Sequence, residues 1–105
     1  MGVNLNKDAF ELLCEIYVTE PLKNAVRDRR FRMTSHFCDR MKLRGMRLID
    51  VSNAVSSGTV KSSEWDVKCK NWKCKVQGVD MNGNQVSIVA AISHKSGVAH
   101  LLTVF

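Results

Sequence analysis

Three polar side chains recur at intervals of four residues in the middle of the chain: His36, Arg40 and Arg44. Residues four apart lie on the same side of an α-helix, so a helix here would align an imidazole with two guanidinium groups. Histidine titrates near neutral pH and is well suited to give or take a proton. Arginine can hold phosphate oxygens through two parallel hydrogen bonds. The spacing is therefore typical of a site that handles a phosphate group.

A second polar group is expected on a β-strand. Residues 73–79 alternate between apolar and polar side chains, as a half-buried strand does. If the apolar side chains pack beneath helices, Lys73, Lys75 and Gln77 form a basic open face. Such a face could follow an RNA backbone.

The last expected strand, residues 99–105, carries two further polar candidates. Strict alternation places Thr103 on the side of Ala99 and Leu101, and His100 on the opposite side. On this reading Thr103 is either a packing residue or part of a site, and His100 is an alternative acid.

Two helices must position the histidine and the arginines. Thr34 and Ser35 offer an N-cap to a helix over residues 36–44, and Gly45 is a typical residue to end it. The apolar stripe of this helix is expected to consist of Phe37 and Met41. A second helix is expected over residues 48–57, with a buried side consisting of Ile49, Val51, Ala54 and Val55.

From residue 59 onward the pattern changes to alternation, which predicts strands over residues 59–62, 73–79, 85–92 and 99–105. Residues 65–70 either continue the first strand or form a loop, and residues 27–33 are either a basic connector or a short strand. Helices followed by strands predict an α+β fold. We expect N-terminal helices packed on one face of a three- to four-stranded antiparallel meander sheet.

Residues 1–31 are expected to form a helical extension to a domain over residues 32–105. A helix capped by Asp8 would carry an apolar stripe of Phe10, Leu13, Cys14 and Tyr17. Glu20-Pro21 is expected to end it, because the residue before a proline avoids the helical region, and residues 22–25 could start the helix again.

The distribution of charge indicates a polyanionic partner. The chain has 105 residues and a formal net charge of +6. Residues 23–48 contain nine basic and two acidic residues, among them Arg29, Arg30 and Arg32, whereas residues 1–22 are net acidic. A concentrated basic block favours nucleic acid first and an anionic membrane second. The alternative is a well-solvated surface.

Several classes of protein are disfavoured by length and composition. One domain of this size cannot house a large two-lobed cofactor enzyme, and no apolar run is long enough to cross a bilayer. The chain shows no signal-peptide pattern, so its four cysteines are expected to be reduced thiols in a cytoplasm. Only Cys69 and Cys74 are close in sequence, and no histidine flanks them, which makes a metal site improbable.

Trp65 and Trp72 flank a lysine-containing stretch. Aromatic side chains between lysines can stack on unpaired bases. A tryptophan in a small domain more often packs in the core or at an interface.

The stretch from His36 to Met46 resembles a motif of the form His-Ala-x-x-Arg-Met-x-x-Arg-Gly-Ile, with Phe37 in place of the alanine. The motif opens an uncharacterised family of small bacterial domains. The later family signals follow in order in residues 58–105: two glycines, a short Asp-x-x-Gly turn, an apolar strand and a closing Thr-Val-aromatic.

That family is similar to the barnase–EndoU–colicin–RelE superfold, whose members are mostly metal-independent ribonucleases and often toxins of toxin–antitoxin pairs. The resemblance implies an endoribonuclease in which a ribose 2′-OH attacks its own phosphodiester, with no cofactor. Under it, the catalytic residues are His36, Arg40, Arg44 and Thr103. The expected RNA-binding residues are Arg29, Arg30, Arg32, Lys73, Lys75 and Gln77, and the expected partners are RNA and a cognate antitoxin.

Simpler roles remain open for the same residues. His36 could be a capping or core-edge residue, and the two motif arginines could be solvated or paired with Asp39 or Asp50. The domain could then be a binding module for RNA or protein, such as an inhibitor or accessory protein of a mobile element.

Overall fold

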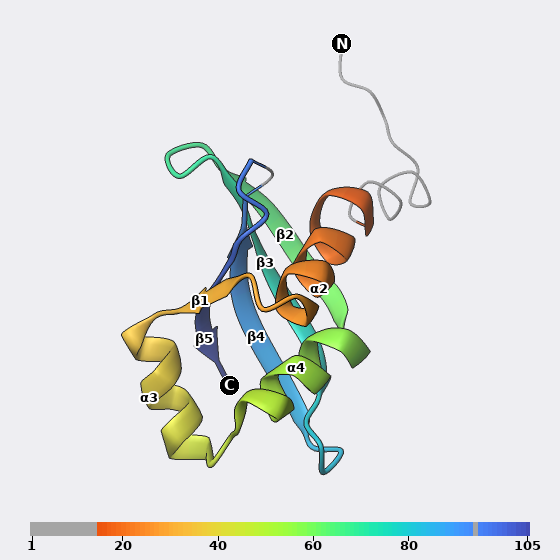
Figure 1. The fold of residues 1–105 in the computed structure, drawn as a ribbon, viewed down its shortest axis with the longest axis vertical. Coiled ribbons are helices and arrows are strands. Elements are labelled where there is room, and N and C mark those ends of the chain that lie inside the picture. Colours follow the sequence, from red (N-terminus) through yellow and green to blue (C-terminus); the bar gives the residue numbers. More distant parts are fainter. Residues whose placement is uncertain (1–14, 94) are drawn as a thin grey trace.

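The computed structural model describes residues 15–93 and 95–105. In chain order the elements are the π-helical turn η1 (Glu15–Thr19), helix α2 (Glu20–Arg27), strand β1 (Phe31–Met33), helices α3 (Ser35–Arg44) and α4 (Leu48–Ser57), and strands β2 (Thr59–Asp66), β3 (Asn71–Val79), β4 (Gln85–Ile92) and β5 (Ala99–Val104). Helices α2 and α4 cover one face of the sheet, and α3 lies at its β5 side (Figure 1). The predicted α+β class is confirmed.

The sheet has five strands in the order β1-β5-β4-β3-β2. Strand β1 pairs with β5 in parallel, and the other neighbours are antiparallel. The expected three- to four-stranded antiparallel meander is therefore wrong in strand number and in one orientation. The reason is that β1 has only three residues and pairs with Ala99–Leu101, far along the chain.

The predicted bounds of α3 and α4 are confirmed to within one residue because local signals set them. The Thr34 hydroxyl accepts a 3.0 Å hydrogen bond from the backbone N–H of Phe37, and Gly45 ends α3 with a left-handed φ of 63°. Helix α4 begins after Arg47, whose backbone N–H donates to the Asp50 carboxylate at 2.9 Å. Thr34 and Gly45 are residue types that favour the two ends of a helix, whereas α4 is capped through the carboxylate of Asp50, its third residue.

The core lies between the sheet and the helices. Phe37, Met41, Val51, Ala54 and Val55 are buried as predicted. Ile49 was also expected in the core, but it is 51 % exposed. It lies with Leu48 in the first turn of α4, and both line a groove on the helix side of the sheet.

Residues 15–31 contribute to the same core as the rest of the domain, through Val18, Leu22, Ala25 and Val26. Pro21 does not end the helical region, since it sits in the first turn of α2, where its missing N–H leaves no hydrogen bond unmade. The Asp8 cap and the stripe positions Phe10, Leu13 and Cys14 lie outside the described residues.

Gly78 allows α4 to pack closely on β3. A Cβ atom at this position would collide with the carbonyl oxygen of Ala54 and lie 3.0 Å from Cα of Gly58. Both glycines belong to the family pattern described above. They fix the distance between helix and sheet on the side opposite the candidate site.

Candidate functional site

The helical and the strand part of the predicted site meet at a hydrogen bond. His36 Nε2 lies 3.0 Å from Oγ1 of Thr103, a residue 67 positions later in the chain. His36 is in the first turn of α3, and Thr103 is near the end of β5. Two residues assigned to one site by resemblance are therefore direct neighbours.

A β-bulge determines which way Thr103 points. On β4, Ala90 pairs with Leu101 and Val89 pairs with Thr103, so Leu102 is left as the extra residue. An extra residue shifts the alternation of the strand by one position. Thr103 thus faces away from Leu101, and the expectation that the two share a side is wrong.

We call the side of the sheet turned away from α2 and α4 the open face. By strand register and alternation it carries Arg32, Lys73, Lys75, Gln77, Val89, His100 and Thr103. The alternation predicted for β3 is confirmed, since Cys74 and Val76 are buried in the core. His100 lies on the same face as Thr103, not on the opposite face as strict alternation predicted.

Lys75 and Thr103 lie in one row across the strands, because Val89 of β4 pairs with both of them. Two strand spacings, roughly 10 Å, separate their backbones. Nζ of Lys75 lies 5.2 Å from the centroid of the Phe105 ring. An aromatic face attracts an ammonium group, so Phe105 helps to hold this cation over the open face.

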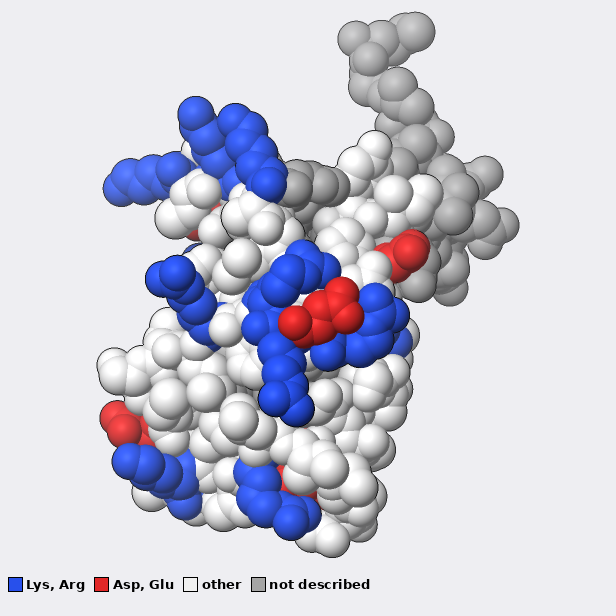
Figure 2. Space-filling model, viewed as in Figure 1, with Lys and Arg blue, Asp and Glu red and all other residues white. Residues whose placement is uncertain are grey.

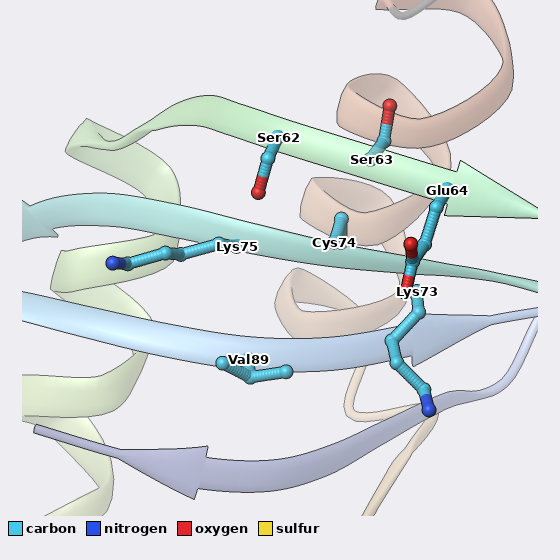
Figure 3. A pocket seen from close by; sticks show the side chains of 7 residues that line it. All are labelled: Ser62, Ser63, Glu64, Lys73, Cys74, Lys75 and Val89. Atoms are coloured by element: carbon cyan, nitrogen blue, oxygen red, sulfur yellow. The ribbon is translucent and has the colours of Figure 1, made fainter.

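A shallow depression on this face is lined by Ser62, Ser63, Glu64, Lys73, Cys74, Lys75 and Val89 (Figure 3). Lys73 Nζ is 3.7 Å from a carboxylate oxygen of Asp66, and Glu64 is its cross-strand partner. Lys73 is therefore partly neutralised, whereas Lys75 faces a serine across the same strand pair.

The two motif arginines attach α3 to the sheet. Arg40 Nε donates to the carbonyl oxygen of Val104 at 3.0 Å, and Arg44 donates to the carbonyl oxygen of Gln85 at 3.5 Å. Arg40 thus lies beside the strand that carries Thr103, and Arg44 reaches the beginning of the neighbouring strand. Arg40 is the better placed of the two to contact a phosphate at His36.

The basic block divides between the two faces of the sheet. Arg32 is exposed and pairs in register with His100 on the open face. Arg30 donates to the Gly97 carbonyl at 2.6 Å and lies 3.4 Å from Asp28, so it secures a turn. Arg29 turns the chain with a φ of 60° and lines the groove on the helix side. On that side, Lys and Arg gather around the link between α2 and β1, with acidic groups among them (Figure 2).

Other reactive groups contribute little to the site. Burial raises the pKa of the Cys74 thiol to about 12, so it stays protonated, and Cys38, Cys69 and Cys74 are free thiols. Within residues 15–93 and 95–105, no cluster of three or more His, Cys, Asp or Glu side chains could hold a metal ion. No helix in this part of the chain is long and apolar enough to cross a membrane.

Trp65 and Trp72 form an edge-to-face pair across the β2–β3 hairpin, with ring centroids 5.4 Å apart. Trp72 packs against the core, and Trp65 is 45 % exposed. Trp72 therefore follows the core interpretation given above.

Taken together, the site offers one imidazole beside a hydroxyl, with Lys75 in the strand row of the hydroxyl and Arg40 one helical turn from the imidazole. An imidazole is a group that can move a proton, and Arg32, Arg40 and Lys75 are the positively charged groups on or beside the same face. Sequence reasoning missed Phe105 as the partner of Lys75, although an aromatic end to a strand of alternating residues was visible.

A comparison with known protein families matches residues 33–105 to a domain described as a domain of unknown function (DUF4258). No curated protein matches the chain, and no solved structure does.

Proposed function

The chain belongs to the DUF4258 family, and we propose that it is a metal-independent endoribonuclease that cleaves RNA by attack of a ribose 2′-OH on the adjacent phosphodiester. The observation that carries this proposal is the 3.0 Å contact between His36 Nε2 and the Thr103 hydroxyl on a basic open face.

The Thr103 hydroxyl marks the position that a substrate hydroxyl would take. In the free protein it shares a hydrogen bond with Nε2 of His36, at the exposed first turn of α3. A ribose 2′-OH in the same place would give its proton to the imidazole as its oxygen attacks phosphorus. The displaced Thr103 hydroxyl would then hydrogen-bond the phosphate.

Positive charge beside this contact supports the proposal. The phosphorane formed in the reaction carries more negative charge at its oxygens than the phosphodiester does, and fixed cations stabilise it. Arg40 lies one helical turn from His36, and Lys75 lies in the strand row of Thr103. A chain that supplies both proton transfer and charge from its own side chains suits cleavage without a metal.

The cellular role proposed here follows the resemblance of the motif to the barnase–EndoU–colicin–RelE superfold. We take the domain to act in the cytoplasm as the toxin of a toxin–antitoxin pair, with RNA as its substrate and a cognate antitoxin protein as its partner. The α+β arrangement is compatible with that superfold.

The direct test is to incubate the purified protein with end-labelled single-stranded RNA in excess chelator. We expect fragments that end in a 2′,3′-cyclic phosphate, and loss of cleavage in His36→Ala. The matched control is Lys95→Ala, which removes an exposed cation from the β4–β5 turn. Absence of cleavage by the unaltered protein, or full cleavage by His36→Ala, would contradict the proposal.

A second candidate function is RNA binding without cleavage. One observation favours it: Lys73, Lys75 and Arg32 are spread along the sheet by their strand positions, as in a surface that follows a backbone. Salt-dependent binding of RNA by a protein that leaves the RNA intact would support this alternative.

A further inference from the structure

His100 and Thr103 share the open face because of the bulge at Leu102. It pairs with Ala91 of β4, and Thr103 pairs with Val89, two positions along the same strand. The neighbours of His100 on its own strand, Ala99 and Leu101, are fully buried, whereas His100 is exposed. The imidazole of His100 therefore projects from the same face as the Thr103 hydroxyl.

The strand register also fixes how far apart the backbones of His100 and Thr103 lie. Two residues of a strand span about 7 Å, which is the backbone separation between the positions of His100 and Thr103. The imidazole of His36 is hydrogen-bonded to the Thr103 side chain. In a direct displacement at phosphorus the base and the acid stand on opposite sides of the phosphate, each within about 3 Å of its oxygen. A backbone spacing of this size places the His100 side chain on the same face as the His36–Thr103 contact, two strand positions away.

The surroundings of His100 suit a bound phosphodiester. The position between His100 and Lys73 is occupied by Ala91, whose side chain is a single methyl group. On the other side, Arg32 of β1 pairs in register with His100. Along this row Arg32 lies on the β1 side of His100, and Lys73, whose charge Asp66 partly offsets, lies beyond Ala91.

We propose that His100 is the second proton-transfer residue of the site, acting as the general acid while His36 acts as the base. This assignment rests on the proposed ribonuclease function. Neutral His36 takes the proton of the 2′-OH, the 2′-oxygen forms a bond to phosphorus, and the bond from phosphorus to the 5′-oxygen breaks. The imidazolium of His100 gives its proton to that leaving oxygen, so the products are a 2′,3′-cyclic phosphate and a free 5′-OH.

The test compares the rates at which the purified chain cleaves two RNA dinucleotides. One has the natural 5′-oxygen at the scissile bond, and the other has sulfur there, which leaves as a thiolate without needing a proton. We expect His100→Gln to lower the cleavage rate of the oxygen substrate by about 10²- to 10⁴-fold and to leave the sulfur substrate cleaved at nearly the rate of the unaltered protein. His36→Gln should slow both substrates, because each needs the 2′-OH to lose its proton.

Three results would overturn the assignment in distinguishable ways. If His100→Gln cleaves the oxygen substrate normally, His100 takes no part in the reaction, and the ribonuclease function stands. If it slows both substrates equally, His100 contributes to binding or to structure. If the unaltered protein cleaves neither substrate, the proposed function itself fails, and the role of His100 fails with it. Because His100 is exposed, the glutamine variant is expected to fold, which a thermal melt confirms.

Discussion

Arg40 Nε donates a 3.0 Å hydrogen bond to the backbone carbonyl of Val104, so an arginine of the helical motif fastens α3 to the edge of β5. We predict that Arg40→Ala lowers both stability and RNA cleavage. A hydrogen bond from a charged donor contributes about 1.5–3 kcal/mol, which would lower the melting temperature of a domain of this size by at least about 5 °C. Arg44→Ala is the control, since its contact to Gln85 is longer at 3.5 Å and exposed. Equal effects of the two changes in a denaturant titration would contradict this role of Arg40.

The hydroxyl of Thr103 should matter to the reaction more than to the fold. Thr103→Val keeps the shape of the side chain and removes the partner of His36 Nε2. We expect cleavage to fall by about tenfold, the value of one net hydrogen bond, with a melting temperature close to that of the unaltered protein. Thr103→Ser should restore cleavage, because it returns the hydroxyl. Initial rates on one labelled RNA check this, and an inactive serine variant would show that the methyl group is what counts.

Two positive charges on opposite faces of the sheet provide a matched pair for RNA binding. Lys75 is on the open face, and Arg29 lines the groove on the helix side. We predict that Lys75→Ala weakens RNA binding and makes the slope of log K against log salt shallower by about 1. Arg29→Ala should change neither the affinity nor the slope. Fluorescence anisotropy at several salt concentrations measures both the affinity and the slope. A larger effect of Arg29→Ala would indicate that RNA binds to the helix side of the sheet.

Gly78→Ala should destabilise the domain, because the new Cβ would meet the carbonyl oxygen of Ala54 in α4. Overpacking of this kind typically costs about 1–3 kcal/mol. Val79→Ala is the control, because it changes an exposed side chain one residue further along β3. It should lower the free energy of unfolding by less. Urea unfolding of the two variants tests whether the helix and the strand approach this closely. A Gly78→Ala variant as stable as the unaltered protein would contradict the close approach.

Asp50 makes stability depend on pH in the acid range. The backbone N–H groups of Arg47 and Met81 donate to its carboxylate and hold the pKa below its usual value, and the Arg47 side chain adds to this. A lowered pKa in the folded state means that the contribution is complete above the ordinary carboxyl pKa and is lost as the pH falls through the folded value.

The expected result is that Asp50→Asn is less stable than the unaltered protein at pH 7, and that the difference shrinks below about pH 4. Melting temperatures measured from pH 7 to pH 3 check this. Glu64→Gln, an exposed carboxyl on β2, serves as the comparison and should show no such convergence. A constant difference between Asp50→Asn and the unaltered protein across this range would contradict the interpretation.

Local signals in the sequence were enough to predict most of the elements. The Thr34 cap and the Gly45 end define α3, and the alternation of residues 73–79 predicts which side chains of β3 are buried. In each case the information lies within a few residues of the element itself, so a single sequence suffices.

Contacts between distant residues were not predictable in the same way. The pairing of β1 with β5 joins residues 68 positions apart, and three residues of strand leave no clear pattern. The bulge at Leu102 leaves no residue-type signal that distinguishes it from regular alternation, so Thr103 and His100 were assigned to opposite faces. The hydrogen bond from Arg30 to the Gly97 carbonyl likewise joins residues 67 positions apart, and the charge pattern from which we predict RNA binding by Arg30 gives no sign of it.

The way α3 joins the sheet has a consequence for self-association. Strand β1 pairs with the first half of β5, and the second half has its outward carbonyls at Leu102 and Val104 taken by Thr34 and Arg40. In the part of the chain that the structure describes, strand-to-strand growth into fibrils could then begin from the outer side of β1, which has only three residues, or from β2, the terminal strand on the other side. That strand is interrupted at Lys61 by a second bulge. A lysine and an irregular edge both oppose the addition of another strand to β2, and the side chains of Thr34 and Arg40, which fasten α3, close the second half of β5 to such an addition.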